Sequence, residues 1–209
     1  MKDKFGIFNS PIKVSNDETN TTNVDLIDIA KEELRKRDIA ENTEKGKVAI
    51  YFAVSPLKLV VMSVCTMGIY ELYWFYKNWV LIKDREKIDI MPFWRSFFAY
   101  FFCYSFFKKV QASAVAVSLD KPITPGLLAT GWIIITVLWK LPDPFWLITY
   151  FAVIFLLPIQ AMVNDINKIV APTHDRNRRF TGWNIFGVIV GGLFFILVLY
   201  GTFFPDTIN

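Results

Sequence analysis

The sequence contains one histidine, His174, and two cysteines, Cys65 and Cys103. We therefore expect neither a histidine-based metal cluster nor a serine-type triad, and we interpret His174 as a solvated loop residue. Both cysteines lie in apolar runs, where a thiol behaves as a small hydrophobe, and no secreted-type cysteine framework surrounds them. A disulfide between them would require the two segments to touch.

The motifs of common enzyme classes are also missing. The chain has no H-E-x-x-H, no G-x-S-x-G and no P-loop. No basic stripe with interleaved aromatic residues lies outside the apolar segments, so a nucleic-acid partner is not expected. The first 20 residues lack an apolar core and a cleavage site, so we expect internal segments to drive membrane insertion. We predict no catalytic residue, no metal site and no cofactor.

Long apolar segments dominate what is present, in a chain that is 54% hydrophobic and 17% aromatic. Residues 122–139, 144–164 and 180–205 carry no charged side chain. About 20 predominantly apolar residues suffice for a membrane-spanning helix. We therefore predict an all-α, polytopic membrane protein with three firm transmembrane helices.

Two further apolar runs are shorter. Residues 59–70 and 96–107 are each free of charge over only 12 residues, a length more typical of re-entrant or interfacial helices than of full spans. Ser55 and Pro56 form a typical helix start before the first of them. We expect two marginal aromatic helices here, although both runs could still cross if their ionisable groups pair or reach the interface.

The distribution of basic residues predicts the orientation. Basic loops before the first firm span and between the second and third should face the cytoplasm, whereas the opposite side offers only Lys140. The connector over 77–95 carries five basic residues, which a five-span arrangement would export and a three-span arrangement would retain. We favour three spans, with a cytoplasmic N-terminus and a C-terminus outside the cytoplasm.

The domain organisation follows from composition. Residues 1–47 carry nine Lys/Arg against ten Asp/Glu, whereas the remainder is basic. We interpret 1–47 as a cytoplasmic polar tail, largely disordered, with a possible short helix over 24–40. Residues 48–205 form the helical membrane domain, and 206–209 are a short non-cytoplasmic C-terminus.

Residues 66–79 read TMGIYELYWFYKNW. This stretch resembles a family of small multi-pass bacterial membrane proteins that is marked by T-x-G-I-Y-x-x-Y-W and classed as a domain of unknown function. The resemblance covers residues 48–205, with further matching stretches at 164–167 and 178–184. It implies a bacterial inner-membrane location and a helical architecture, and it brings no catalytic residue or ligand. The motif residues are Thr66, Gly68, Tyr70, Tyr73 and Trp74.

The same motif has a physical interpretation. Gly68 permits a turn or a close helix contact, and Thr66 can hydrogen-bond to backbone freed there. Tyrosine and tryptophan rings such as Tyr70, Tyr73 and Trp74 favour the headgroup region of a bilayer. We therefore favour interfacial anchoring by this helix, with a cage for an aromatic ligand or a lipid as the alternative.

Glu71 is the strongest candidate for chemistry, because an ionisable group in an apolar stretch is costly and usually marks a functional site. Its partner would come from another segment, and Lys108 and Lys109 are the candidates. The neighbouring aromatic residues favour a different interpretation, in which Glu71 is a hydrated carboxylate at the membrane interface.

Gln160, Asn164 and Asn167 recur at helical spacing and place three amides on one face of the second span. In lipid such groups must face protein or a water-filled cavity. We favour hydrogen bonds between helices, with Asn184 as a partner, over an ion or solute pathway. Asp165 is expected to pair with Lys168.

Gly187 and Gly191 form a G-x-x-x-G pattern in the longest span. Small residues at this spacing let two helix backbones approach closely. We favour packing against another helix of the same chain over dimerisation.

These features lead us to expect a non-catalytic inner-membrane protein that scaffolds, assembles or regulates other membrane components. Its partners would be the lipid bilayer and another membrane protein or a second copy. The expected working surfaces are the Gly187/Gly191 face and the aromatic motif. The alternative is a small transporter or channel that uses Glu71 and the amide stripe. A lipid-modifying enzyme would need Glu71, Asp120 and Asp165 in one pocket.

Overall fold

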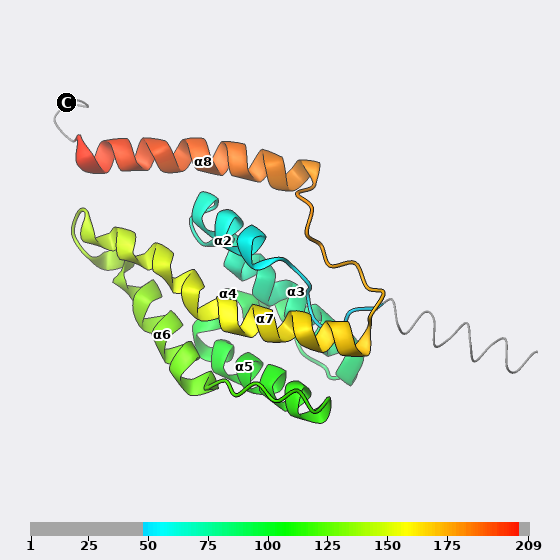
Figure 1. Cartoon of the computed structure of the whole chain (residues 1–209). Helices are drawn as coiled ribbons and strands as arrows, with labels where there is room; N and C mark the ends of the chain where they lie inside the picture. Colours follow the sequence, from blue (N-terminus) through cyan, green and yellow to red (C-terminus); the bar gives the residue numbers. More distant parts are fainter. Residues whose placement is uncertain (1–47, 205–209) are drawn as a thin grey trace, which may run out of the picture. The chain divides into compact units, whose positions relative to one another are not determined.

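The computed structural model describes residues 48–204 (Figure 1). The expected disordered tail, the helix over 24–40 and the C-terminal residues 206–209 lie outside the described residues. Within 48–204 all regular secondary structure is helical and there is no strand, in agreement with the all-α prediction. Its elements are α2 (Pro56–Cys65), α3 (Ile69–Glu86), α4 (Pro92–Phe97), α5 (Ala99–Ala116), α6 (Pro125–Val137), η1 (Leu138–Lys140), η2 (Phe145–Ala152), α7 (Val153–Val170) and α8 (Gly182–Phe203).

Helices α2 and α3 form a hairpin. As predicted, Ser55 begins α2, and its hydroxyl accepts a hydrogen bond from the Lys58 N–H at 3.2 Å. The turn after α2 places Gly68 at φ 84°, a left-handed conformation that glycine adopts without steric cost. The Thr66 hydroxyl donates to the Met62 carbonyl at 2.7 Å and accepts from the Tyr70 N–H at 3.0 Å. Thr66 and Gly68 therefore join the two helices through this turn.

A second pair of helices packs beside this hairpin. The short helix α4 follows α3 and packs against it, and α5 begins directly after α4. The guanidinium of Arg95 on α4 lies 4.6 Å from the ring centroid of Trp79 and 5.1 Å from that of Phe102. Arginine is thus held between rings from α3 and α5, an arrangement favoured by cation–π attraction.

Two helices are long and apolar enough to cross a membrane, Phe145–Val170 and Gly182–Phe203. The first begins as the 3-10 helix η2 and continues through Pro158 as α7. The prediction of three firm spans is not confirmed. The remaining segment is a shorter apolar helix, Pro125–Lys140, because the chain before Pro125 is extended and the last turn of that segment is the 3-10 helix η1. Two such helices suggest a membrane location.

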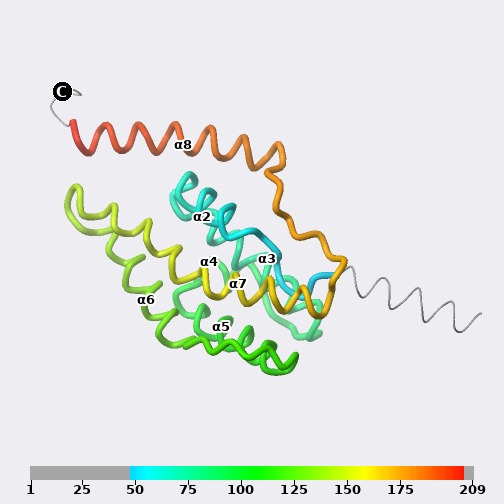
Figure 2. The backbone as a smooth tube through the Cα atoms, viewed as in Figure 1, coloured from blue at the N-terminus to red at the C-terminus, as the bar shows by residue number. Residues whose placement is uncertain are grey.

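Helix α8 is apolar and lies on the surface of the molecule, with none of its residues buried. A capping box begins it: the Thr181 hydroxyl accepts from the Asn184 N–H, and the Asn184 side chain accepts from the Thr181 N–H. It packs against α2, beside which it lies in both ribbon and tube views (Figures 1 and 2), and its Phe195 ring contacts the Tyr150 ring of η2 at a centroid distance of 4.8 Å.

The core is an aromatic cluster where α3, α5 and α6 meet. Phe75 packs its ring against Trp74, Phe106 and Trp132 at centroid distances between 5.0 and 5.8 Å. All four side chains are buried. Edge-to-face pairs of this kind add to the stabilisation that burial of the rings provides.

This core corrects the interfacial interpretation of the aromatic motif. Trp74 and Trp79 are fully buried and Tyr70 is 6% exposed, whereas Tyr73 is 46% exposed. The rings at helical spacing on one side of α3 therefore pack inside the protein rather than at a lipid interface. Only the opposite side of the helix presents its aromatic residues outward.

The molecule has two chemically different ends. The polar end lies toward the right in Figure 1. It comprises the start of α2, the ends of α3, α5 and α7, and the start of α8. The opposite end holds the α2–α3 turn, the turn between η1 and η2, and the end of α8. Ion pairs join elements at the polar end, among them Lys109 with Glu86 and Lys121 with Asp165. Both helix pairs, α2–α3 and α4–α5, start and finish there.

Candidate functional site

The amides of α7 bind an extended segment, residues 50–54, that precedes α2. The Asn167 Oδ1 accepts hydrogen bonds from the N–H groups of Ile50 and Tyr51 at 3.1 and 3.2 Å, and its Nδ2 donates to the Tyr51 carbonyl at 2.9 Å. The Asn164 Nδ2 donates to the Val54 carbonyl at 2.9 Å. Buried backbone outside a helix or sheet needs such partners, and the amide stripe provides them.

Gln160 and Asn78 complete this set from two helices. The Gln160 Nε2 donates to the Asn164 Oδ1 at 2.9 Å and to the Phe52 carbonyl at 3.4 Å, while its Oε1 accepts from the Trp74 indole N–H. On α3, the Asn78 Oδ1 accepts from the Phe52 N–H at 3.0 Å, and its Nδ2 donates to the Trp74 carbonyl at 2.9 Å. These side chains bond to backbone and to one another, and Asn164 also lines a cavity at the polar end.

Asn184 does not belong to this stripe. Its side chain caps α8 through Thr181, so the expected hydrogen bond between Asn184 and the amides of α7 is wrong. The predicted pair of Asp165 with Lys168 is confirmed at 2.6 Å, and Lys121 binds the other carboxylate oxygen. The partner of the stripe is an extended segment of the chain, which helical spacing alone does not reveal.

Glu71 lies inside the protein, and the interpretation as a hydrated interfacial carboxylate is wrong. Its residue is only 7% exposed, and its Oε2 accepts a hydrogen bond from the Trp132 indole N–H at 2.8 Å. The candidate partner Lys109 pairs with Glu86 instead, at 2.6 Å. Glu71 is buried because it continues the inward-facing stripe of α3, three and four residues before Trp74 and Phe75.

A cavity of about 340 Å³ lies beside Glu71 at the opposite end. Aromatic side chains from three elements line it, namely Tyr100, Trp139, Trp146 and Tyr150, together with hydroxyl side chains and the backbone turn at Gly68. It is formed where α3, α5, the η1 segment and η2 come together. Neither Trp132 nor this cavity could be assigned from the local pattern around Glu71.

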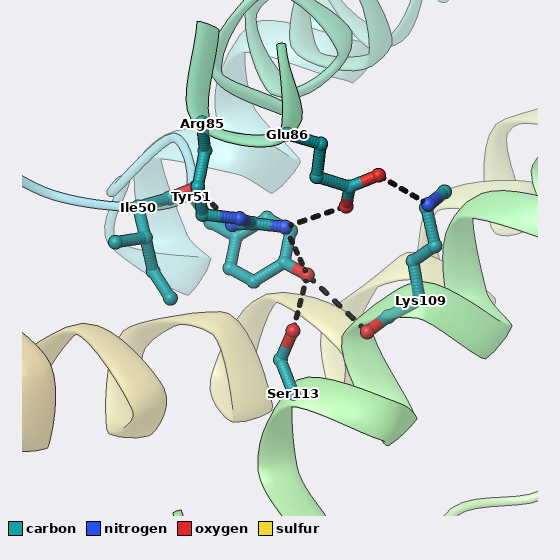
Figure 3. Close-up of polar contacts among 6 residues, drawn as sticks. All are labelled: Ile50, Tyr51, Arg85, Glu86, Lys109 and Ser113. Carbon is teal, nitrogen blue, oxygen red and sulfur yellow. Dashed lines mark hydrogen bonds and ion pairs between the residues drawn. The ribbon is translucent and has the colours of Figure 1, made fainter. Parts of the chain in front are cut away.

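The polar end carries a second cluster, around Glu86 (Figure 3). The Glu86 carboxylate binds the Arg85 guanidinium at 3.1 Å and the Lys109 ammonium at 2.6 Å. Burial raises the pKa of Glu86, but the hydrogen bonds and positive charges of Lys109 and Arg85 outweigh it and hold the pKa below its ordinary value. The cluster therefore joins the end of α3 to α5 as an ionised carboxylate.

Tyr51 extends this cluster to the segment before α2. Arg85 donates to the Ile50 carbonyl at 2.9 Å and to the Tyr51 hydroxyl at 3.3 Å, and it stacks 4.6 Å from the centre of the Tyr51 ring. The same hydroxyl bonds to Ser113 at 2.7 Å and to the Lys109 carbonyl at 3.2 Å (Figure 3). Sequence analysis missed the contact between Tyr51 and Arg85, since the two residues lie 34 positions apart.

A smaller cavity, of about 220 Å³, opens at the polar end beside Asn164, Lys168, His174 and Arg176. His174 is 6% exposed and its Nδ1 contacts the Ala171 carbonyl, so the expectation of a solvated histidine is wrong. Lys58 is also buried, and its Nζ donates to Asn177 and to the Arg179 carbonyl at 2.8 and 2.9 Å. Both contacts hold the loop between α7 and α8.

The glycine pattern of α8 lies against α2. A Cβ at Gly191 would collide with the Cys65 carbonyl, whereas a Cβ at Gly187 would be 3.7 Å from the Met62 Cε. A Cβ at the adjacent Gly192 would meet nothing within 4 Å. Gly191 thus permits the close approach of the two helices, and Gly192 faces away from this contact.

The acidic residues do not form one cluster. Glu71 lines the cavity at the opposite end, whereas Asp165 binds Lys121, the neighbour of Asp120, at the polar end. Within residues 48–204, no three His, Cys, Asp or Glu side chains lie close enough together to hold a metal ion. Cys65 and Cys103 are both free thiols.

Comparison with known proteins gives no relative. No family model matches the chain, and no curated protein and no solved structure is similar to it. The resemblance of the T-x-G-I-Y-x-x-Y-W motif to a bacterial membrane-protein family therefore stays a prediction.

Proposed function

We propose that this chain is a non-catalytic integral component of a bacterial inner membrane that assembles with another membrane protein through the open face of α8. The observation that carries this proposal is the position of α8. It is 22 residues long, it carries no charged side chain, and one side of it contacts α2 while none of its residues is buried. A soluble protein rarely exposes such a surface.

The glycines of α8 support a protein partner in addition to lipid. Gly191 faces α2, whereas a Cβ at Gly192 would meet no atom within 4 Å. Small residues let helix backbones approach closely in a membrane, and a bulky side chain would prevent it. Gly192 gives a second helix room to pack, with large exposed side chains such as Ile189 and Leu193 on α8.

The proposed orientation places the polar end in the cytoplasm. Arg85, Lys109, Lys121 and Lys168 form ion pairs there, whereas Lys140 lies in the turn between η1 and η2 at the opposite end. This asymmetry is typical of a cytoplasmic polar end. The α2–α3 and α4–α5 pairs would then be re-entrant, and α6, Phe145–Val170 and α8 would cross.

This arrangement changes the expected working surfaces. The aromatic motif cannot act as one contact surface for a partner, because Trp74 is fully buried in the core. Gly191 already packs against α2 and is not free for a partner. The remaining surface is the open face of α8, which the proposal assigns to the partner.

Photo-crosslinking in native membranes tests the proposal. A photoreactive residue at Leu197, which is 66% exposed, should give a discrete adduct with another membrane protein or a second copy. The same residue at Val188, which packs against the core, is the matched control and should give no intermolecular adduct. If Leu197, Leu193 and Ile189 all yield only lipid adducts, the proposal is wrong.

A small transporter or channel is the second candidate, and the cavity beside Glu71 favours it. A buried carboxylate next to a cavity is typical of ion and proton pathways. The amide stripe no longer supports this function, because Gln160 and Asn167 bind other groups of the chain. This candidate is tested by proton or ion flux into vesicles that contain the wild type, vesicles that contain Glu71→Gln, and empty vesicles. Equal flux in all three excludes transport.

A further inference from the structure

The cavity beside Glu71 has a buried carboxyl group to which no basic side chain of the described residues is paired. Within residues 48–204, the basic groups that form ion pairs bind Glu86 or Asp165. Glu71 instead accepts a hydrogen bond from the neutral indole of Trp132 at 2.8 Å, in a residue that is 7% exposed. A cation placed next to a carboxyl group that is removed from water strongly stabilises its ionised form.

The walls of the cavity suit one kind of cation. Tyr100, Trp146 and Tyr150 line it together with Glu71. Aromatic rings attract alkylated ammonium groups, whose methyl or methylene groups also gain by leaving water. A metal ion would need several oxygen or nitrogen ligands, and the described residues offer no such group of acidic or histidine side chains here. An aromatic wall with one carboxylate is typical of ammonium sites.

The rim of the cavity already holds a cation over a ring. The Lys140 Nζ lies 5.6 Å from the centroid of Trp139, which lines the same cavity and is 60% exposed. Asp143 adds a second carboxylate nearby, which accepts from the Trp146 indole at 2.7 Å. One acidic and one basic side chain therefore contact indole rings that line the cavity.

We propose that this cavity binds an organic ammonium group, with Glu71 as its counter-ion and Tyr100, Trp146 and Tyr150 around its alkyl substituents. The ammonium is carried either by the headgroup of an amine-containing phospholipid or by a small soluble amine. The site lies at the opposite end, away from the Glu86 cluster. It does not depend on the role proposed for α8.

Calorimetric titration of the full chain tests the proposal, in a detergent without ammonium groups. Choline is the probe, and 3,3-dimethylbutan-1-ol, which has the same shape without the charge, is the matched control ligand. Choline should bind at least about tenfold more tightly than the alcohol to the wild type, and Glu71→Gln should lose at least about tenfold in affinity. Gln keeps an oxygen for the Trp132 N–H, and a thermal melt checks that the variant folds.

Two further variants complete this test. Glu86→Gln removes one negative charge at the polar end and should bind choline like the wild type. Lys140→Gln should bind choline equally well or more tightly. If choline bound only after Lys140 was removed, or if Glu71→Gln bound it like the wild type, the proposal would be overturned.

Lipid retention identifies the source of the ammonium. The protein is purified from membranes that contain both amine and anionic phospholipids and is analysed by native mass spectrometry. If the ligand is a lipid, the wild type should retain an amine phospholipid and Glu71→Gln should not. Choline binding without a retained lipid assigns the site to a soluble amine. If the wild type neither binds choline nor retains an amine lipid, the proposal is overturned.

Discussion

Asn167 on α7 binds both the N–H and the C=O of Tyr51, a residue 116 positions earlier in the chain. Together with its bond from the Ile50 N–H, this amide gives an extended segment the partners that a neighbouring strand would give it in a sheet. The segment enters the protein between α3 and α7 without forming secondary structure. Irregular buried backbone is tolerated where the protein supplies its hydrogen-bond partners.

Asn167→Leu should therefore be strongly destabilising. The change leaves two N–H groups and one carbonyl unsatisfied, and each buried unsatisfied group costs about 1–3 kcal/mol. Asn164→Ala is the matched comparison, because it removes one backbone hydrogen bond from a partly exposed position. Thermal unfolding in detergent should rank Asn167→Leu well below Asn164→Ala. Equal midpoints would show that the segment is not held by this amide.

Gly191→Leu should separate α8 from α2. Even a Cβ at this position meets the Cys65 carbonyl, which is backbone and cannot rotate away. We expect a loss of roughly 1–3 kcal/mol. The adjacent Gly192→Leu should change stability by less than about 0.5 kcal/mol, since the new side chain enters open space.

The same pair of glycines separates fold from function. Gly192→Leu should reduce the photo-crosslink from Leu197 while leaving the unfolding midpoint unchanged. If Gly192→Leu instead destabilises the protein as much as Gly191→Leu, the glycine contact is assigned to the wrong face.

Trp132→Phe should destabilise the protein through Glu71. The indole N–H is the donor to a carboxylate in a residue that is only 7% exposed, and its removal leaves that carboxylate without this bond. The expected cost is about 1–3 kcal/mol. Trp139→Phe, at a 60% exposed position, controls for the loss of an indole. Chemical denaturation of both variants makes the comparison. A Glu71→Leu background, which has no acceptor for the indole N–H, should remove most of the cost of Trp132→Phe.

The Glu86 cluster predicts how stability depends on pH. The ion pairs with Lys109 and Arg85 hold the pKa of Glu86 below its ordinary value of 4.5. A lowered pKa contributes stability that is fully present above 4.5 and is lost as pH falls through the folded-state pKa. The effect is small, because both partners of the ion pairs are partly exposed.

Unfolding midpoints between pH 7 and pH 3 measure this contribution. Glu86→Gln should be less stable than the wild type at pH 7 and should approach it at pH 3. Asp84→Asn, which alters an exposed carboxylate two residues earlier, should keep the wild-type slope. A slope for Glu86→Gln that equals the wild type would contradict the assignment.

Local patterns predicted the parts of the fold that depend on neighbouring residues. The Ser55 cap, the turn at Gly68, the Asp165–Lys168 pair and the long apolar helix α8 all follow from residues close together in sequence. The third firm span is not confirmed, because the apolar run over 122–139 includes an extended stretch before Pro125 and its helix is shorter than the run.

The surroundings of the polar residues could not be predicted in this way. Glu71 binds Trp132, 61 positions away, and the amide stripe binds residues more than 100 positions earlier. A periodic pattern shows which residues share a face, but it does not show what covers that face. Glu71, Trp74 and Asn78 share one face of α3 by their spacing in the sequence. This spacing could have predicted that Glu71 is buried in the protein.

Cysteine accessibility from the two sides of the membrane tests the central claim most directly. Single cysteines at Asp89, Asp120, Asp143 and Asp175, all exposed, are introduced into a variant without Cys65 and Cys103 and treated with a membrane-impermeant reagent. The account predicts that 89, 120 and 175 react from the cytoplasmic side and 143 from the other. Labelling of 89 from the same side as 143 would contradict the re-entrant α2–α3 pair, and labelling of all four from both sides of sealed vesicles would contradict a membrane-spanning protein.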